Sequence, residues 1–255
     1  MFTEDAIIFC DADSLFFRPA AAVSKDGLKR NWKSDIRKAI NHTVNTIKRE
    51  CMSDKIMHAV KGKGNFRHGI YKDYKANRKE LNDDLRTALN YGHGYMCDKH
   101  GAVMADDMEA DDLVCIWAHE AIEENQDYYI AGIDKDLLQI PGNHFNFVKS
   151  THVYVDHDAG HLNLMRQCLT GDTADNIPGI KGIGPKKADK ILNGIPSSRQ
   201  WSRVRAAWRG HNAGDPTTSR RLLELLTSWE EYETIRSKAE SESVQRKQDV
   251  LSGEK

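Results

Sequence analysis

Two carboxylates and a glycine-rich turn lie side by side near the middle of the chain. Asp172 and Asp175 are three residues apart, a spacing that places them on one face of a helical turn. The glycine-rich segment 179–184 follows at once and leads into Lys186 and Lys187. Carboxylates can hold a hard cation, and a glycine turn before a basic helix start can bind a phosphate. This pattern predicts a metal-dependent enzyme that acts on nucleic acid.

Further acids are predicted to converge with this pair. Asp11 and Asp13 follow one short apolar run, and Asp134 and Asp136 follow another. The carboxyl ends of parallel strands meet at one edge of a sheet, so these side chains are expected to lie close together. Three more acids stand at the start of a predicted helix, where the helix dipole favours negative charge, namely Glu109, Asp111 and Asp112.

Such a cluster needs counter-ions. Two like charges about 4 Å apart repel by roughly 4 kcal/mol at an effective dielectric of about 20. Oxygen ligands without His or Cys at matching spacing favour Mg²⁺ or Mn²⁺ over Zn²⁺. Two such ions could activate a water molecule and stabilise the leaving oxygen of a phosphodiester.

Basic residues are concentrated in one segment although the net charge of the chain is only -1. Residues 61–79 carry seven Lys or Arg and a single acid, Asp73. Aromatic residues such as Phe66 and Tyr74 alternate with these cations. Aromatic rings can stack on unpaired bases while Lys and Arg neutralise phosphates, although a solvated basic helix face would show the same composition.

Composition indicates a protein of the reducing interior of a cell. The length of 255 residues suits one large α/β domain with or without a small appendage. The five cysteines have no paired spacing, which argues against a disulfide scaffold or a zinc ribbon. The N-terminus lacks a signal-peptide pattern, and no apolar stretch approaches the roughly 20 residues that cross a bilayer. We therefore expect no membrane association and a cytoplasmic location.

Apolar runs and amphipathic stretches alternate along the first two thirds of the chain. Strands are expected at 6–10, 55–60, 128–133 and 145–148, and helices at 34–50, 83–89 and 111–124. This alternation is typical of a parallel sheet covered by helices. Residues 61–108 otherwise look irregular, and the pattern from residue 162 onward is all helical.

Taken in chain order, these motifs resemble the structure-specific 5′-nucleases: flap endonucleases, phage 5′→3′ exonucleases and the 5′-nuclease domain of DNA polymerase I. The resemblance covers about residues 7–192. The matching strings are FCD at 9–11, FRH at 66–68, YKANR at 74–78, EADD at 109–112, DKDLL at 134–138 and the segment 171–188, which looks like a helix–three-turn–helix. The resemblance implies an α/β PIN-like fold, with a mostly parallel sheet flanked by helices and a C-terminal helical region.

The resemblance also implies roles for particular residues. The acids on metal-ligand positions are Asp11, Glu109, Asp111, Asp112, Asp134, Asp136, Asp172 and Asp175. Lys75 and Arg78 fall on the basic pair that contacts the scissile phosphate. The residues expected to contact nucleic acid are Arg67, Tyr74, Lys181, Gly182, Gly184, Lys186 and Lys187. A K⁺ ion among the turn carbonyls at 181–183 is a further implication.

One position departs from the family. Its members usually have an Asp six residues before the Phe of the FRH string, and this chain has Val60 there. No carboxylate lies between Lys55 and Lys72. Either the first metal has one ligand fewer, or water or Asp13 substitutes. Asp13 has no certain counterpart in the family and is not included in the expected ligand set.

The sequence thus predicts a monomeric 5′→3′ exonuclease or flap endonuclease with two Mg²⁺ or Mn²⁺ ions. Its expected substrate is DNA with a free 5′ end, a flap or a nick, in replication or repair in a bacterial or phage-infected cell. The alternatives are a PIN-type nuclease directed at RNA and a DNA-binding protein weakened in catalysis by Val60. The expected parts are an α/β core at 1–160 with a basic arch segment at about 61–106, a helical DNA-binding region at 161–236 packed on the core, and a mobile charged tail at 237–255.

Overall fold

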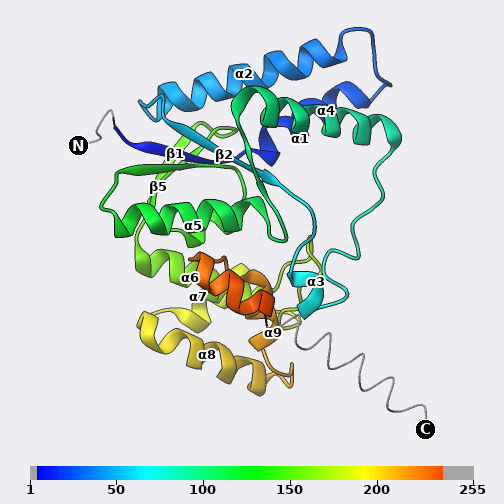
Figure 1. Cartoon of the computed structure of the whole chain (residues 1–255). Helices are drawn as coiled ribbons and strands as arrows, with labels where there is room; N and C mark the ends of the chain where they lie inside the picture. Colours follow the sequence, from blue (N-terminus) through cyan, green and yellow to red (C-terminus); the bar gives the residue numbers. More distant parts are fainter. Residues whose placement is uncertain (1–4, 238–255) are drawn as a thin grey trace.

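A computed structural model describes residues 5–237 and has a six-stranded sheet at its centre (Figure 1). The sheet order is β3-β2-β1-β4-β5-β6. The strands are β1 (Ile7–Asp11), β2 (Ile56–Lys61), β3 (Val103–Ala105), β4 (Tyr128–Ala131), β5 (Gly142–Asn146) and β6 (Thr151–Val155). Strands β1 to β5 are parallel, and β6 pairs with β5 in the antiparallel direction. The expected mostly parallel sheet is confirmed.

Helices cover both faces of this sheet, as Figure 1 shows. One face carries α1 (Asp13–Ser24), α2 (Trp32–Glu50) and α4 (Asp83–His100), and the other carries α5 (Ala110–Glu123). The run in β1 is apolar because both of its faces are buried: Ile8 and Cys10 pack toward the α1–α2–α4 side, and Phe9 packs toward α5.

Helix α2 is positioned by the stripe that its sequence predicts. Ile36, Ile40, Val44 and Ile47 recur at helical spacing, and all four are buried. Each such side chain stabilises the fold by roughly 1.5–3 kcal/mol relative to an exposed one. The stripe packs α2 against α1 and α4, and these two helices in turn contact β2 of the sheet.

Several elements differ from the sequence-based expectation. Helix α1 was not expected, and neither were the edge strands β3 and β6. Helix α4 continues well past Leu89 to His100 and is capped by Gly101, whose left-handed φ of 62° is typical of the residue after a helix C-terminus. Strand β6 escaped detection because residues 151–154 are exposed at the sheet edge and show no apolar alternation.

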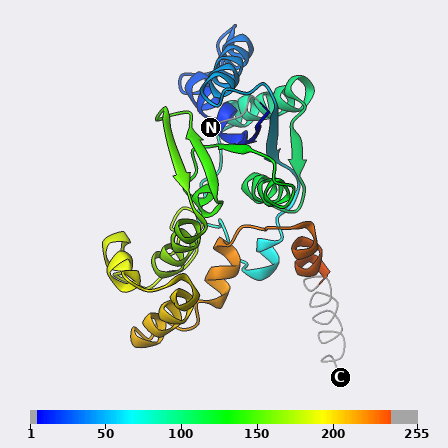
Figure 2. The ribbon, with the colours of Figure 1, turned by 90° about the vertical axis from the view of Figure 1, so that its left-hand side faces the viewer.

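A helical region follows the sheet. It contains α6 (His157–Thr170), α7 (Pro185–Leu192), α8 (Ser197–Gly210) and α9 (Thr217–Leu223), which share a separate apolar core. Trp208 is buried there and donates from Nε1 to the Cys168 carbonyl at 2.9 Å. Short α3 (Arg67–Ile70) lies beside α9, where Figure 2 shows it in cyan next to orange.

The turns between α6 and α7 close on themselves. Asp172 and Ile177 exchange two main-chain hydrogen bonds, of 3.0 and 2.7 Å. Gly171 has φ +68°, and a Cβ there would come within 2.5 Å of the Ile177 carbonyl oxygen. The chain therefore needs glycine at this position to bring Asp172 back toward the sheet. The expected mobile tail lies outside the described residues from 238 onward, and no helix within 5–237 is long and apolar enough to span a bilayer.

Candidate active site

The carboxyl ends of β1 and β4 and the start of α5 meet at a pocket of about 160 Å³. Its lining residues are Asp11, Asp13, Lys61, Lys75, Arg78, Glu109, Ala110, Asp111 and Asp134. Acids outnumber cations in this set. The predicted convergence of strand-end acids with the acids at the start of α5 is thus observed.

The geometry makes two of these carboxylates, those of Asp11 and Asp111, costly to ionise. Burial, followed by the charges of Asp13 and Asp134, raises the pKa of Asp11 to about 7. Burial and the neighbouring Glu109 raise the pKa of Asp111 well above its usual range. A carboxyl with a raised pKa is one whose charge lacks compensation, and a bound divalent cation would supply it.

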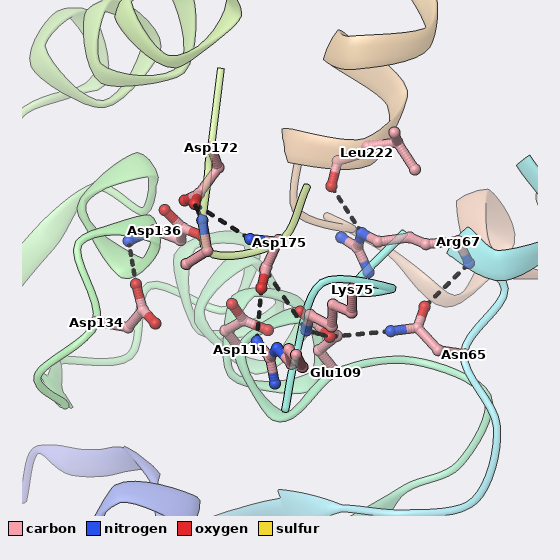
Figure 3. Close-up of polar contacts among 12 residues, drawn as sticks. Asn65, Arg67, Lys75, Glu109, Asp111, Asp134, Asp136, Asp172, Asp175 and Leu222 are labelled. Atoms are coloured by element: carbon pink, nitrogen blue, oxygen red, sulfur yellow. Dashed lines mark hydrogen bonds and ion pairs between the residues drawn. The ribbon is translucent and has the colours of Figure 1, made fainter. Parts of the chain in front are cut away.

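A second group of acids, Asp136, Asp172 and Asp175, adjoins the pocket acids and lies between η1 (Asp136–Gln139) and the turns after α6 (Figure 3). Asp134 lines the pocket and also contacts this second group. Asp134 accepts a hydrogen bond of 3.0 Å from the Asp136 main-chain N–H, and Asp136 accepts one from Gln167. Burial and Asp134 raise the pKa of Asp136 to about 7. For Asp172, burial acts upward, but a 2.6 Å bond from Lys135 outweighs it, and the net pKa shift is downward.

Lys75 bridges the two groups of acids, and Arg78 binds Asp175 beside it. Lys75 Nζ contacts Glu109 and lies 3.6 Å from Asp175, while Arg78 donates to Asp175 at 2.5 Å. Figure 3 shows Lys75 between Glu109 and Asp175. Lys75 has a left-handed φ of 58°. Its main-chain N–H donates to the Asp175 carbonyl at 2.9 Å, so the basic segment is tied to the turns after α6.

The acids do not yet form a closed metal cage. Within residues 5–237, no three Asp, Glu, His or Cys side chains already converge on one point at ligand distance. Lys75, Arg78 and Lys135 engage the carboxylates instead. The donor set nevertheless fits a hard cation, because it consists of carboxylate oxygens, and burial together with neighbouring acids raises the pKa of Asp11, Asp111 and Asp136. Coordination would require these side chains to turn away from the cations.

Residues 6–164 match the family model described as the 5′-3′ exonuclease, N-terminal resolvase-like domain. The chain belongs to this family. The flap endonuclease Xni of Shewanella piezotolerans is 30% identical over 136 residues, which cover 50% of this chain and 53% of that protein. DNA polymerase I of Borreliella burgdorferi is 34% identical over 139 residues, which cover 50% of this chain and 15% of the polymerase. The chain spans about half the length of the first of these relatives.

Solved structures share the fold. A bacteriophage T5 flap endonuclease in complex with DNA and metal ions superposes with a TM-score of 0.64 at 18% identity, over 86% of this chain and 89% of that one. The T5 protein co-crystallised with metal ions gives 0.66 at 15% identity, over 92% and 98%. Identities this low show the fold alone, and that fold agrees with the PIN-like expectation.

Two expected site residues form a buried ion pair instead. Asp112 is fully buried, and Arg67 donates to its two carboxylate oxygens at 2.5 and 2.8 Å. Arg67 also donates from Nε to the Leu222 carbonyl at 2.8 Å. Arg67, at 1% exposure, is closed to nucleic acid, and Asp112 is turned away from the pocket. The expectation that Arg67 contacts DNA is therefore wrong, and Asp112, which was expected to bind a metal ion directly or through water, is held by Arg67 outside the pocket.

The expected contact of Tyr74 with nucleic acid is also wrong. The sequence predicts that it contacts nucleic acid, but it is only 2% exposed and packs in the apolar core of the helical region with Leu164 and Leu169. Its ring lies under Lys75, whose Nζ is 4.9 Å from the ring centroid. Tyr74 therefore anchors the base of the basic segment in this apolar core.

The glycine turn and the start of α7 form an exposed surface. The five residues predicted to bind nucleic acid here are all exposed: Lys181, Gly182, Gly184, Lys186 and Lys187. Gly184 is the N-cap of α7, and Lys187 Nζ donates to the Gly182 carbonyl at 2.8 Å. Their role in DNA binding, like the K⁺ ion at 181–183, stays a prediction.

The structure adds residues that the expected site omitted. Asp13 and Lys61 both line the pocket, and Lys135 binds Asp172. Asp13 lies two residues after Asp11, and Lys135 lies between two expected ligands, so proximity in sequence was the available signal. Val60 is fully buried in the apolar core, which confirms that β2 brings no carboxylate to the pocket from that position.

Proposed function

We propose that this chain is a metal-dependent 5′-nuclease, acting as a monomeric 5′→3′ exonuclease or flap endonuclease on DNA with a free 5′ end, a flap or a nick. The observation that carries the proposal is the carboxylate pocket with Lys75 and Arg78 fixed across it, in a chain of the 5′-3′ exonuclease family. The names of the relatives, a flap endonuclease and DNA polymerases, support DNA as the substrate over the RNA-directed alternative.

The two groups of acids would hold two Mg²⁺ or Mn²⁺ ions. Asp11, Glu109 and Asp111 would bind the first, and Asp134, Asp136, Asp172 and Asp175 the second. Bound ions would activate a water molecule for in-line attack and stabilise the leaving oxygen. The T5 structures that contain metal ions support a metal-dependent site in this fold.

Lys75 and Arg78 would act on the phosphate itself. Both cations are held at the pocket by the bonds that tie residues 75–78 to Asp175. With the carboxylates engaged by metal ions, these two side chains would face the same space. They would then stabilise the charge that develops on the phosphate oxygens. The residue pair thus links the α/β core to the helical region across the reaction site.

The exposed turn at residues 181–187 would grip duplex DNA away from the reaction. Main-chain N–H groups at the start of α7 and the lysines around them suit a phosphate backbone. A K⁺ ion at the carbonyls of 181–183 would assist this contact. We accordingly propose the division into a catalytic core at 1–160 and a helical DNA-binding region at 161–236 packed on it.

Cleavage of a 5′-labelled flap duplex with Mg²⁺, Mn²⁺ or EDTA tests the proposal. The matched control is Asp134→Asn, which removes one pocket carboxylate without changing its size. We expect metal-dependent product from the unmodified chain and none with EDTA or in the variant. Retained duplex binding without product in either metal would overturn the nuclease function and favour a DNA-binding protein weakened by Val60.

A further inference from the structure

The second strand ends without an acid in the pocket. Val60 is 0% exposed and packs in the apolar core with Phe16 and Met96. Lys61, the last residue of β2, lines the pocket and brings a positive charge there. The strand that runs beside β1 therefore contributes no ligand for a cation held by Asp11.

Asp13 places a carboxylate at the end of that strand from another element. It is the first residue of α1, and its Oδ1 accepts a hydrogen bond of 3.0 Å from the Lys61 main-chain N–H. The segment before it is fixed, because Ala12 donates to the Ala59 carbonyl at 2.8 Å. Asp13 thus lies one residue beyond Val60 along β2, in the pocket that Asp11 also lines.

The end of β2 is itself held in place by α4. His93 Nε2 is 2.9 Å from the Lys61 carbonyl, a hydrogen bond when that nitrogen carries the proton. The ring of His93 also packs edge-on against Phe16, with the centroids 6.1 Å apart. Lys61 is therefore fixed on its carbonyl side by His93 and on its amide side by Asp13, which fixes the direction of the Asp13 carboxylate.

We propose that Asp13 supplies the carboxylate that β2 lacks and binds the first divalent ion together with Asp11 and Glu109; this inference rests on the function proposed above. An ionised carboxylate has two oxygens. The bond to Lys61 uses one of them, and the second remains for a cation in the pocket. His93 and Lys61 act as positioning residues for this ligand, because their hydrogen bonds orient the Asp13 carboxylate and neither side chain has an oxygen that could bind the ion.

Metal binding in the absence of DNA tests this role directly. Free Mn²⁺ would be measured by electron paramagnetic resonance during titration of the unmodified chain and of Asp13→Asn. Asn keeps the oxygen that accepts from Lys61, so the fold is preserved while the charge is removed. The matched control is Asp106→Asn, since Asp106 is exposed, accepts from the Lys63 main-chain N–H at 2.8 Å and does not line the pocket. Asp11→Asn serves as the positive reference.

We expect Asp13→Asn to weaken the binding of one Mn²⁺ ion by at least about tenfold, as Asp11→Asn does, while Asp106→Asn leaves it unchanged. If Asp13→Asn binds Mn²⁺ with the affinity of the unmodified chain while Asp11→Asn loses one Mn²⁺ ion, the role of Asp13 is refuted and the nuclease proposal still stands. Absence of Mn²⁺ binding by the unmodified chain would overturn both. If thermal unfolding in EDTA shows that Asp13→Asn is not folded, Asp13→Ser is titrated in its place, with the same expected loss.

Discussion

The buried pair of Arg67 and Asp112 predicts that replacing Asp112 by Asn destabilises the metal-free protein. The Asp112 carboxylate accepts from Arg67 and also from the main-chain N–H groups of Glu109 and Leu226, at 2.9 and 3.2 Å. Asn fits the same space but removes the charge that faces the guanidinium. The Arg67 cation would then stay buried without its counter-ion.

The expected loss is large. Removing one partner of a buried ion pair costs about 3–5 kcal/mol, out of a total stability of about 5–15 kcal/mol for a folded domain. For a chain of this size, that corresponds to a drop in melting temperature of roughly 6–20 °C. Replacing a pocket carboxylate by its amide should have the opposite effect on the stability of the metal-free protein. The pKa of Asp11 is raised from 3.8 to about 7, so removing its charge should stabilise the metal-free protein on the order of 4 kcal/mol at pH 8.

Thermal unfolding followed by circular dichroism in EDTA at pH 8 separates the two cases. Asp112→Asn should melt below the unmodified chain and Asp11→Asn above it. The double variant Arg67→Met/Asp112→Asn should lose less than the sum of its two single variants, because the partners interact. A melting temperature of Asp112→Asn at or above that of the unmodified chain would refute the ion-pair role and return Asp112 to the pocket cluster.

Three other outcomes follow from the same structure. Lys75→Ala should lower turnover by orders of magnitude while duplex binding persists, and lost binding with unchanged single-turnover cleavage of the bound complex would contradict the role of Lys75. Mg²⁺ should raise the melting temperature only slightly at pH 5.5 and more at pH 8. The reason is that Asp11 and Asp136, whose pKa values are raised to about 7, must lose protons to bind the ion. A rise in melting temperature that does not depend on pH would argue against these two ligands. Burial lowers the pKa of His58 from 6.5 to about 4, so the unfolded chain binds a proton that the folded chain does not, and stability falls as the pH drops from 6.5 to 4. In urea unfolding, His58→Leu should lose less stability between pH 6.5 and pH 4 than the unmodified chain. An equal loss in both proteins would exclude His58 as the cause.

The sequence was informative where local position fixes the chemistry. Asp11 and Asp134 follow apolar strands, and the ends of parallel strands can lie only at one edge of the sheet, so their convergence was predictable. The stripe of α2 was equally clear because its four aliphatic residues share one face. Strand β3 escaped detection for the opposite reason. It is three residues long, pairs with β2 at the edge of the sheet, and has two exposed residues, so no local pattern marks it.

The sequence by itself determined the fold class and the group of acids from which a metal site is built. Only the tertiary structure decided which of those acids faces the pocket. Asp111 and Asp112 are neighbours at the start of one helix, where consecutive side chains point about 100° apart. Arg67 lies 45 residues earlier in the chain, and it takes Asp112 into the core while Asp111 lines the pocket. A partner so distant in sequence is brought into contact only by packing, which is why composition and spacing could not separate the two carboxylates.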